Sequence, residues 1–119
     1  MRENVVKNKS FEFAIRVVRL YQFLVSDKKE FVLSKQLLRS GTSVGAMVRE
    51  SEHSESKADF IHKLSIAQKE INETIYWLEL LKATDYLTQE QFESINNDAV
   101  EIIKLITTII KTTKSNINN

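Results

Sequence analysis

The chain has 119 residues, of which 42% are hydrophobic and 28% are charged, and its formal net charge is +1. This length and balance fit a single folded domain, residues 1–119, and exclude a disordered chain. The sequence holds no cysteine, no proline and only two glycines, which excludes disulfide scaffolds, thiolate metal sites and turn-rich β folds. It shows neither a signal peptide nor a membrane-spanning run, so we expect a cytoplasmic protein without a membrane partner.

Apolar residues recur at helical spacing in four segments, and the pattern predicts helices at about residues 10–27, 34–53, 57–84 and 89–112. Ser10 is the expected N-cap of the first helix. The residues that share its apolar stripe, and are expected to face the core, are Phe11, Ala14, Val17, Val18, Tyr21, Leu24 and Val25.

The second helix contains both glycines of the sequence. Gly41 and Gly45 lie about one turn apart inside the second helix, where each glycine costs about 1 kcal/mol relative to alanine. We expect close approach by another helix to offset this cost, with a local kink as the alternative.

Ser56 and Thr88 each begin a capping-box pattern, so the third and fourth helices should start directly after them. The polar residues from Thr112 onward are expected to fray.

Short connections make consecutive helices antiparallel, which predicts an all-α fold, an up-down-up-down antiparallel four-helix bundle. Such a bundle needs one apolar stripe per helix, yet the first and third helices have further large apolar side chains. Single exposed apolar side chains are common, but several on two helices, including the only tryptophan, indicate a surface for self-association. The candidate oligomer interface is Phe13, Leu20, Phe23, Ile66, Trp77 and Leu80.

One side of the second helix is polar. A hairpin that turns near residue 55 brings Arg39 level with Glu70 and Glu73, which predicts a cross-helix ion pair with a structural role. The candidate polar network is Gln36, Arg39, Ser43, Glu50, Glu70 and Glu73.

The sequence contains no known catalytic or cofactor-binding motif, so we expect no enzyme, no catalytic residue and no cofactor. Residues 50–53 and 59–62 have the Glu/Asp-x-x-His spacing found in di-iron bundles. Both elements crowd the expected turn between the second and third helices, and the other helices cannot complete a carboxylate shell at that level. We therefore expect no metal site.

Charge is divided unevenly along the chain. Residues 1–49 hold ten Lys and Arg against four Asp and Glu, a net charge of +6, whereas residues 50–119 hold seven against twelve, a net charge of −5. The favoured interpretation is that the two parts neutralise each other in the folded bundle, and the alternative is phosphate binding by the basic part. The candidate nucleic-acid contacts are Lys7, Lys9, Arg16, Arg19, Lys28, Lys29, Lys35 and Arg39.

Two stretches of the sequence resemble a known family. The run Leu37-Leu38-Arg39-Ser40-Gly41-Thr42-Ser43-Val44-Gly45-Ala46, followed by Val48-Arg49-Glu50, is similar to the signature of the four-helix bundle family named for the 23S rRNA intervening-sequence protein. Residues 56–61, 66–67 and 73–81 carry the same resemblance, which spans about residues 11–110. It implies an up-and-down bundle that assembles into a ring-like pentamer. The related accessory variability proteins of diversity-generating retroelements form pentameric barrels that partner a reverse transcriptase and bind nucleic acid.

The leading hypothesis is a non-enzymatic, homo-oligomeric helical scaffold or adaptor, with RNA or a nucleoprotein as a candidate partner and no small-molecule substrate. The resemblance implies that the oligomer is a pentamer. The alternative is a nucleic-acid-binding module that uses the basic N-terminal part of the chain. A metal-dependent enzyme ranks third.

Overall fold

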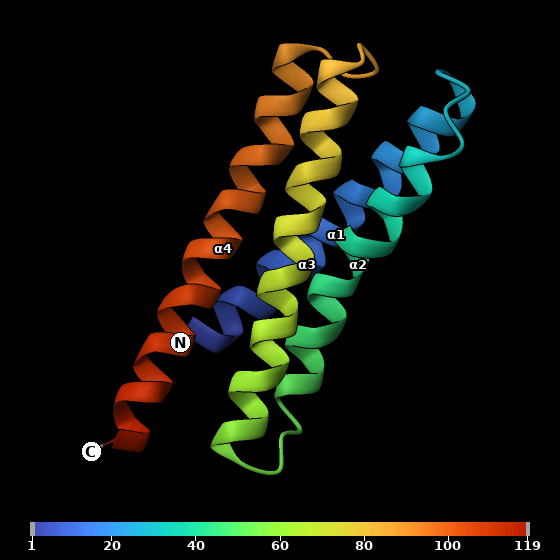
Figure 1. Cartoon of the computed structure of the whole chain (residues 1–119). Coiled ribbons are helices and arrows are strands. Elements are labelled where there is room, and N and C mark those ends of the chain that lie inside the picture. Colours follow the sequence, from blue (N-terminus) through green and yellow to red (C-terminus); the bar gives the residue numbers. More distant parts are fainter. Residues whose placement is uncertain (1, 119) are drawn as a thin grey trace.

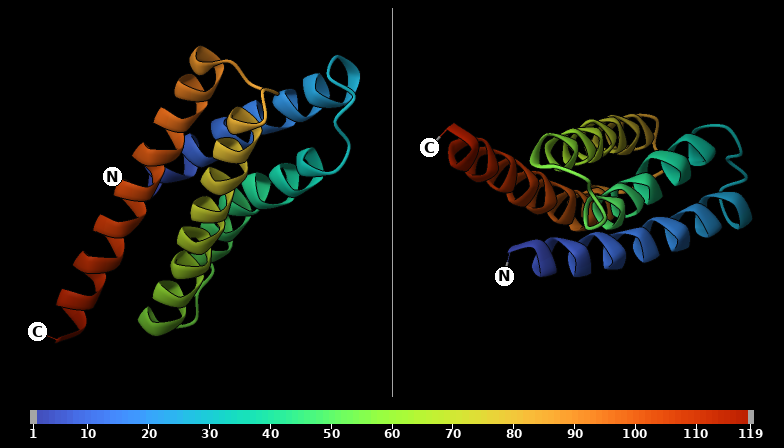
Figure 2. Two further views of the ribbon diagram at one scale, coloured as in Figure 1. Left: turned by 45° about the horizontal axis from the view of Figure 1, so that its top comes forward. Right: turned by 90° about the horizontal axis from the view of Figure 1, so that it is seen from below.

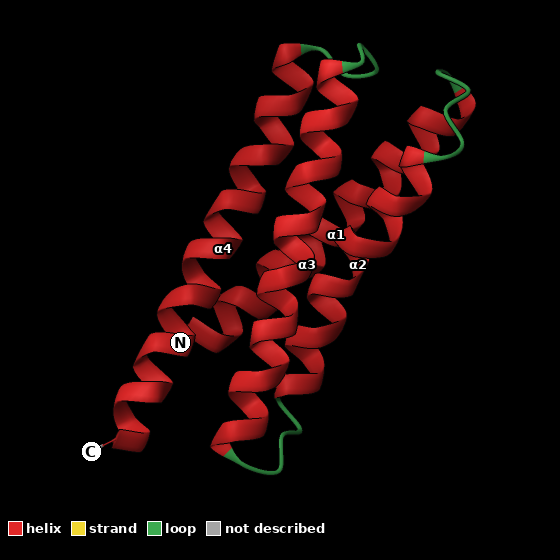
Figure 3. Ribbon diagram, viewed as in Figure 1, coloured by secondary structure: helices red, strands yellow, loops and turns green. Residues whose placement is uncertain are grey.

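Four α-helices make up the part of the chain that the computed structural model describes, namely the backbone of residues 2–118 and the side chains of residues 5–116. They are α1 (Arg2–Ser26), α2 (Leu33–Ser51), α3 (Lys57–Ala83) and α4 (Gln89–Asn118), and no strand occurs in this range (Figures 1 and 3). Consecutive helices run in opposite directions, so the predicted up-down-up-down bundle is confirmed. The ends of the predicted domain, residues 1 and 119, lie outside the described residues.

Each helix packs against two neighbours around a single core. α1 contacts α2 and α4, and α3 contacts the same two helices, whereas α1 and α3 lie across the core from each other. The α1–α2 hairpin is inclined to the α3–α4 hairpin in an elongated molecule of 51 × 22 × 20 Å (Figures 1 and 2). None of the described helices has an apolar stretch sufficient to cross a membrane. The largest side chains in the core are Phe13, Leu24, Leu37, Leu64, Ile71, Leu78, Leu81, Ile102 and Ile106.

The first and last helices extend beyond their predicted ends. α1 starts at Arg2, so the predicted N-cap is wrong: the Ser10 hydroxyl lies inside the helix and donates to a carbonyl oxygen one turn earlier (3.1 Å). The extension is favoured because Val6, only 2% exposed, continues the buried side of α1 into the core. α4 continues past Thr112 to Asn118 instead of fraying, because its buried Ile109–Ile110 pair is followed by neither glycine nor proline.

The other helix boundaries follow the predicted caps. The Ser56 hydroxyl accepts the Asp59 N–H (3.0 Å) and starts α3. At the start of α4, the Thr88 hydroxyl accepts the Gln91 N–H (3.1 Å), and the Gln91 side chain accepts the Thr88 N–H (2.9 Å). This reciprocal pair is the predicted capping box. α2 and α3 end at Ser51 and Ala83, within two residues of the predicted ends.

A buried carboxylate that the sequence pattern did not reveal holds the start of α2. Glu30, 8% exposed, accepts the N–H groups of Val32 (3.2 Å), Leu33 (3.0 Å) and Ser34 (2.7 Å). The Ser34 hydroxyl donates in return to the Glu30 carbonyl oxygen (2.8 Å). Burial alone would raise the pKa of Glu30, but these donors outweigh it and lower the pKa below its ordinary value of 4.5. The α1–α2 loop is therefore fixed by its own hydrogen bonds.

Gly41 and Gly45 allow α1 to pack closely against α2, as the sequence predicts. A Cβ atom at position 41 would lie 2.7 Å from both γ carbons of Val17. A Cβ atom at position 45 would lie 3.2 Å from the Ser10 carbonyl oxygen. Both distances are shorter than ordinary van der Waals contact, so the two glycines set the separation of these helices.

Only some residues of the apolar stripe predicted for the first helix face the core of the bundle. Val17 and Leu24 lie in the core, whereas Phe11 is 50% exposed and Val18 is 37% exposed. Phe13, which was expected on the outside, is buried instead. α1 has apolar residues on two opposite sides, so helical spacing alone could not decide which side would face the core. The remaining members of the predicted stripe are half-buried: Ala14, Tyr21 and Val25.

Candidate functional site

The residues of the candidate oligomer interface do not form one surface. Phe13 is 1% exposed and belongs to the core, so its predicted place on the outside is wrong. Leu20 and Phe23 are half-buried and, together with Ile95, line a hollow of about 490 Å³ between α1 and α4. We call this hollow the α1–α4 groove.

The members of the candidate interface on the third helix lie elsewhere. Ile66, Trp77 and Leu80 are half-buried on α3, which is across the bundle from α1. Beside them the exposed Tyr76 ring packs edge-on against the Trp77 ring, with their centroids 5.0 Å apart. The predicted interface is therefore divided between a core position, the α1–α4 groove and α3.

A further apolar surface lies on the outer side of α1, where the sequence pattern had assigned residues to the core. Phe11, Ile15 and Val18 are 50%, 40% and 37% exposed. Together with Ala14 they form what we call the α1 outer face. It extends towards α2 over a shallow hollow of about 240 Å³, where the Arg49 guanidinium lies 4.9 Å from the centroid of the Phe11 ring. A helix that is apolar on two sides leaves one of them available for contact after folding.

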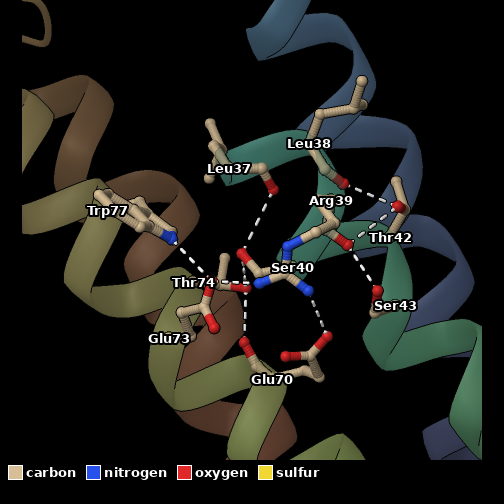
Figure 4. A network of polar contacts seen from close by, with 10 residues as sticks. All are labelled: Leu37, Leu38, Arg39, Ser40, Thr42, Ser43, Glu70, Glu73, Thr74 and Trp77. Atoms are coloured by element: carbon tan, nitrogen blue, oxygen red, sulfur yellow. Dashed lines mark hydrogen bonds and ion pairs between the residues drawn. The ribbon is translucent and has the colours of Figure 1, made fainter. Parts of the chain in front are cut away.

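The ion pair predicted between the second and third helices is present (Figure 4). The Arg39 guanidinium bonds the carboxylates of Glu70 (2.9 Å) and Glu73. The Glu73 carboxylate also accepts the Trp77 indole N–H (3.0 Å), and the Ser43 hydroxyl donates to the Arg39 carbonyl oxygen (2.6 Å). Two predicted members make no hydrogen bond or salt bridge with this described network: Gln36 and Glu50.

The electrostatics of this network indicate helix pairing. The Trp77 N–H and the Arg39 guanidinium lower the pKa of Glu73, so this carboxylate stays charged at neutral pH. Its hydrogen bond in turn raises the pKa of Arg39. Directly inward, the buried Thr74 hydroxyl donates to the buried Ser40 hydroxyl (2.9 Å), which also joins α3 to α2. Because the Arg39 side chain is 51% exposed, its ion pairs contribute less than about 1 kcal/mol.

Half of the candidate nucleic-acid contacts form salt bridges within the chain. The three on α1 are Lys7 with Glu52 (3.3 Å), Lys9 with Glu101 (2.5 Å) and Arg16 with Asp98 (2.5 Å), and Arg39 is the fourth cation. Each bridge joins the basic part of the chain to the acidic part, as the favoured interpretation of the charge division predicts. The candidates outside the salt bridges of the described residues are Arg19, Lys28, Lys29 and Lys35.

Among the described residues, no three His, Asp or Glu side chains lie close enough together to hold a metal ion. In one of the two Asp/Glu-x-x-His elements, the Asp59 carboxylate bonds the Lys63 ammonium (2.9 Å) and the Glu55 N–H (3.2 Å), and these contacts lower the pKa of Asp59. Asp59 therefore stabilises the start of α3.

Comparisons with known proteins found both a family and a close structural relative. A family model described as 23S rRNA-intervening sequence protein matches residues 2–108. The chain is similar to a crystal structure at 1.70 Å resolution of a protein with unknown function from the S23 ribosomal protein family of Bacteroides thetaiotaomicron VPI-5482. The two share 66% sequence identity, with a TM-score of 0.93, over 93% of this chain and 99% of that chain. No curated protein matches the chain.

Proposed function

Because the chain belongs to the 23S rRNA-intervening sequence protein family and keeps an apolar surface outside its core, we propose that it is a non-enzymatic, homo-oligomeric helical scaffold or adaptor. The α1 outer face is the observation that carries this proposal. Phe11, Ile15 and Val18 are large apolar side chains that a monomer would leave in water. Covering them with a second copy gains about 25 cal/mol for each Å² of apolar surface removed from water.

The proposed assembly is a ring-like pentamer, which the resemblance to the family implies. A closed ring suits a surface of this kind because every copy then has its apolar face covered and no end is left to grow.

RNA or a nucleoprotein is the proposed partner. The family description names an rRNA insertion, and the structural relative is assigned to a ribosomal protein family. The alternative, a nucleic-acid-binding module that uses the whole basic part, has less support, because four of its eight candidate cations are paired with carboxylates. The cations that remain for phosphate are Arg19, Lys28, Lys29 and Lys35.

Light scattering after size exclusion tests the self-association. We expect the wild-type mass to be a multiple of the 13.8 kDa of one chain at micromolar concentration. Ile15→Glu should give a monomer with unchanged helical circular dichroism, because Ile15 is 40% exposed and contributes little to the core. The matched control is Tyr76→Glu on α3, 56% exposed, which should leave the mass unchanged. A wild-type mass of one chain would overturn the scaffold proposal.

A salt titration of RNA binding tests the partner. If phosphate contacts hold the RNA, the logarithm of affinity falls linearly with the logarithm of salt concentration. Replacing Lys28, Lys29 and Lys35 with glutamine should then flatten that slope by about one unit for each lysine that contacts phosphate. If the wild-type oligomer binds no RNA at low salt, RNA is excluded as the partner and a protein partner is left.

A further inference from the structure

The α1–α2 loop, residues 27–32, presents two adjacent apolar side chains to water. Phe31 is 51% exposed, and Val32 is 70% exposed, more than any other large apolar side chain among the described residues. The loop lies at the end of the α1–α2 hairpin, clear of the connection between α3 and α4 (Figures 1 and 2). Neither side chain packs against the core. We call Phe31 and Val32 the loop tip.

The fold holds the loop tip in place at a cost. Lys29 has a φ of 54°, in the left-handed region that few residues other than glycine, asparagine and aspartate adopt. Glu30 keeps a buried carboxylate for the N–H groups that follow the tip, and its own N–H donates to the Leu24 carbonyl oxygen (2.9 Å). Backbone strain and a buried charge both cost stability, and strain of this kind gathers where a segment is held ready to bind. The loop tip is therefore preorganised for a partner.

The charges around the loop tip are mostly positive. Asp27 and Glu30 are the acidic residues of the loop: Asp27 is exposed and accepts the Ser26 hydroxyl (2.7 Å), whereas the Glu30 carboxylate is buried among backbone donors. The Lys28 ammonium lies 5.9 Å from the centroid of the Phe23 ring. Three exposed lysines lie within three residues of the tip in the sequence and form no salt bridge among the described residues: Lys28, Lys29 and Lys35. The exposed charges here are thus three cations and one carboxylate, which favours an anionic partner.

We propose that the loop tip binds a single-stranded segment of RNA, with the Phe31 ring stacked on an unpaired base and the lysines at neighbouring phosphates. This inference rests on RNA as the partner in the proposed function, and it specifies the form of the RNA and the place where it binds. An aromatic ring among cations suits a single strand because every base has a flat face and every nucleotide carries a phosphate. A duplex keeps its bases stacked on one another and offers the lysines only its backbone. One exposed ring matches one base, whereas a helix that binds a membrane surface uses a whole apolar face.

Fluorescence anisotropy with two labelled RNAs tests the form of RNA that is bound: a uridine oligomer, and the same oligomer annealed to its adenosine complement. At low salt the wild type should bind the single strand more tightly than the duplex. Phe31→Leu keeps an apolar side chain but removes the flat ring. It should therefore weaken binding of the single strand by about tenfold and leave the duplex affinity and the oligomer mass unchanged.

Two further variants control for the ring and for its position. Phe31→Tyr keeps the flat ring and should bind both RNAs as the wild type does. Tyr76→Leu removes an exposed ring outside the loop, on α3, and should also leave both affinities unchanged.

Tryptophan fluorescence tests the stacking itself. The sequence has one tryptophan, so the double variant Phe31→Trp/Trp77→Phe carries its only indole at the loop tip. Saturation with the single strand should quench this indole, because a stacked base lies against its face. The same RNA should leave the Trp77 fluorescence of the wild type unchanged. An unquenched indole in the saturated complex would overturn the stacking.

The outcomes separate this inference from the proposed function. Equal affinity of the wild type for the two RNAs, or undiminished binding of the single strand by Phe31→Leu, would overturn the inference and leave RNA as the partner. If the wild type binds neither RNA, the inference and the RNA partner both fall, while the oligomer mass still decides the scaffold proposal. Co-sedimentation with phosphatidylserine vesicles, without binding of either RNA, would place the loop tip on a membrane surface and overturn the inference.

Discussion

Replacing Gly41 with alanine should destabilise the bundle, although alanine is the better helix former. On an exposed helix this change gains about 1 kcal/mol. Here the new methyl group would lie 2.7 Å from both γ carbons of Val17. Val17 is fully buried, and a β-branched side chain in a helix has one strongly preferred rotamer, so it cannot turn away. The clash must be relieved by moving α1 away from α2.

The expected size of the effect follows from two opposing contributions. Overpacking of a buried contact costs about 1–3 kcal/mol, so subtracting the gain in helix propensity leaves a net loss of about 0–2 kcal/mol. Gly45→Ala is the matched control, because it gains the same propensity but approaches a single Ser10 carbonyl oxygen at 3.2 Å. A shift of a few tenths of an ångström relieves that contact. Gly41→Ala should therefore be less stable than Gly45→Ala by about 1 kcal/mol, or about 4 °C in Tm.

A double-mutant cycle with Val17 isolates the contact. Val17→Ala alone removes two buried methyl groups and should cost about 2 kcal/mol. In the Gly41→Ala background it should cost about 1–2 kcal/mol less, because the new methyl group occupies the space that Val17 leaves. Urea unfolding followed by circular dichroism measures each variant, and repeating it at tenfold higher protein concentration separates self-association from folding. A Gly41→Ala chain more stable than wild type, or additive effects in the cycle, would refute the reasoning.

Three other predictions concern polar groups. Glu30→Ala should cost about 2 kcal/mol in urea unfolding because three N–H groups lose their acceptor, and Glu30→Gln should cost less. The folded-state pKa of Glu30 lies below 4.5. The extra free energy of unfolding of wild type over Glu30→Gln should therefore be complete above pH 4.5 and disappear as the pH falls through the folded-state pKa, which urea unfolding across this range would measure. Arg39→Gln should cost less than about 1 kcal/mol but change the Trp77 fluorescence spectrum, because both side chains share one carboxylate. Ser40→Ala and Thr74→Val should each cost about 1 kcal/mol or less in thermal unfolding, because the hydroxyl that remains keeps a bond to a backbone carbonyl of its own helix, at Leu37 for Ser40 and at Glu70 for Thr74.

The helical architecture could be predicted because its signals are local. The capping pairs at Ser56 and Thr88 need only neighbouring residues, so they form as the sequence indicates. The ion pairs of Arg39 could be predicted because a short turn fixes the register of the hairpin formed by α2 and α3. Close packing of another helix at the two glycines could be predicted because glycine within a helix costs stability that a compensating contact must offset.

The orientation of α1 and the cap of α2 depend on tertiary contacts. Apolar side chains occupy two opposite sides of α1, and contacts with the other helices, such as the fit of Val17 against Gly41, select the buried side. The assignment of Phe11 to the core and of Phe13 to the surface failed for this reason. Glu30 gave no signal because glutamate is not a preferred N-cap residue, and its effect depends on the burial that brings three N–H groups to one carboxylate.

The cap formed by Glu30 also decides where the chain can accept added sequence. Surface loops are the usual positions for inserting a tag or for joining the ends in a circular permutant. In the α1–α2 loop, any insertion between residues 30 and 34 would separate one carboxylate from the N–H groups that it holds, and the start of α2 would lose its anchor. A position directly after His53 in the α2–α3 connection is better suited, because His53 is exposed and the bonds of Glu55 and Ser56 to Asp59 all lie beyond that position. Hydrogen bonding of the backbone, more than exposure, therefore separates a rigid connection from a permissive one in this bundle.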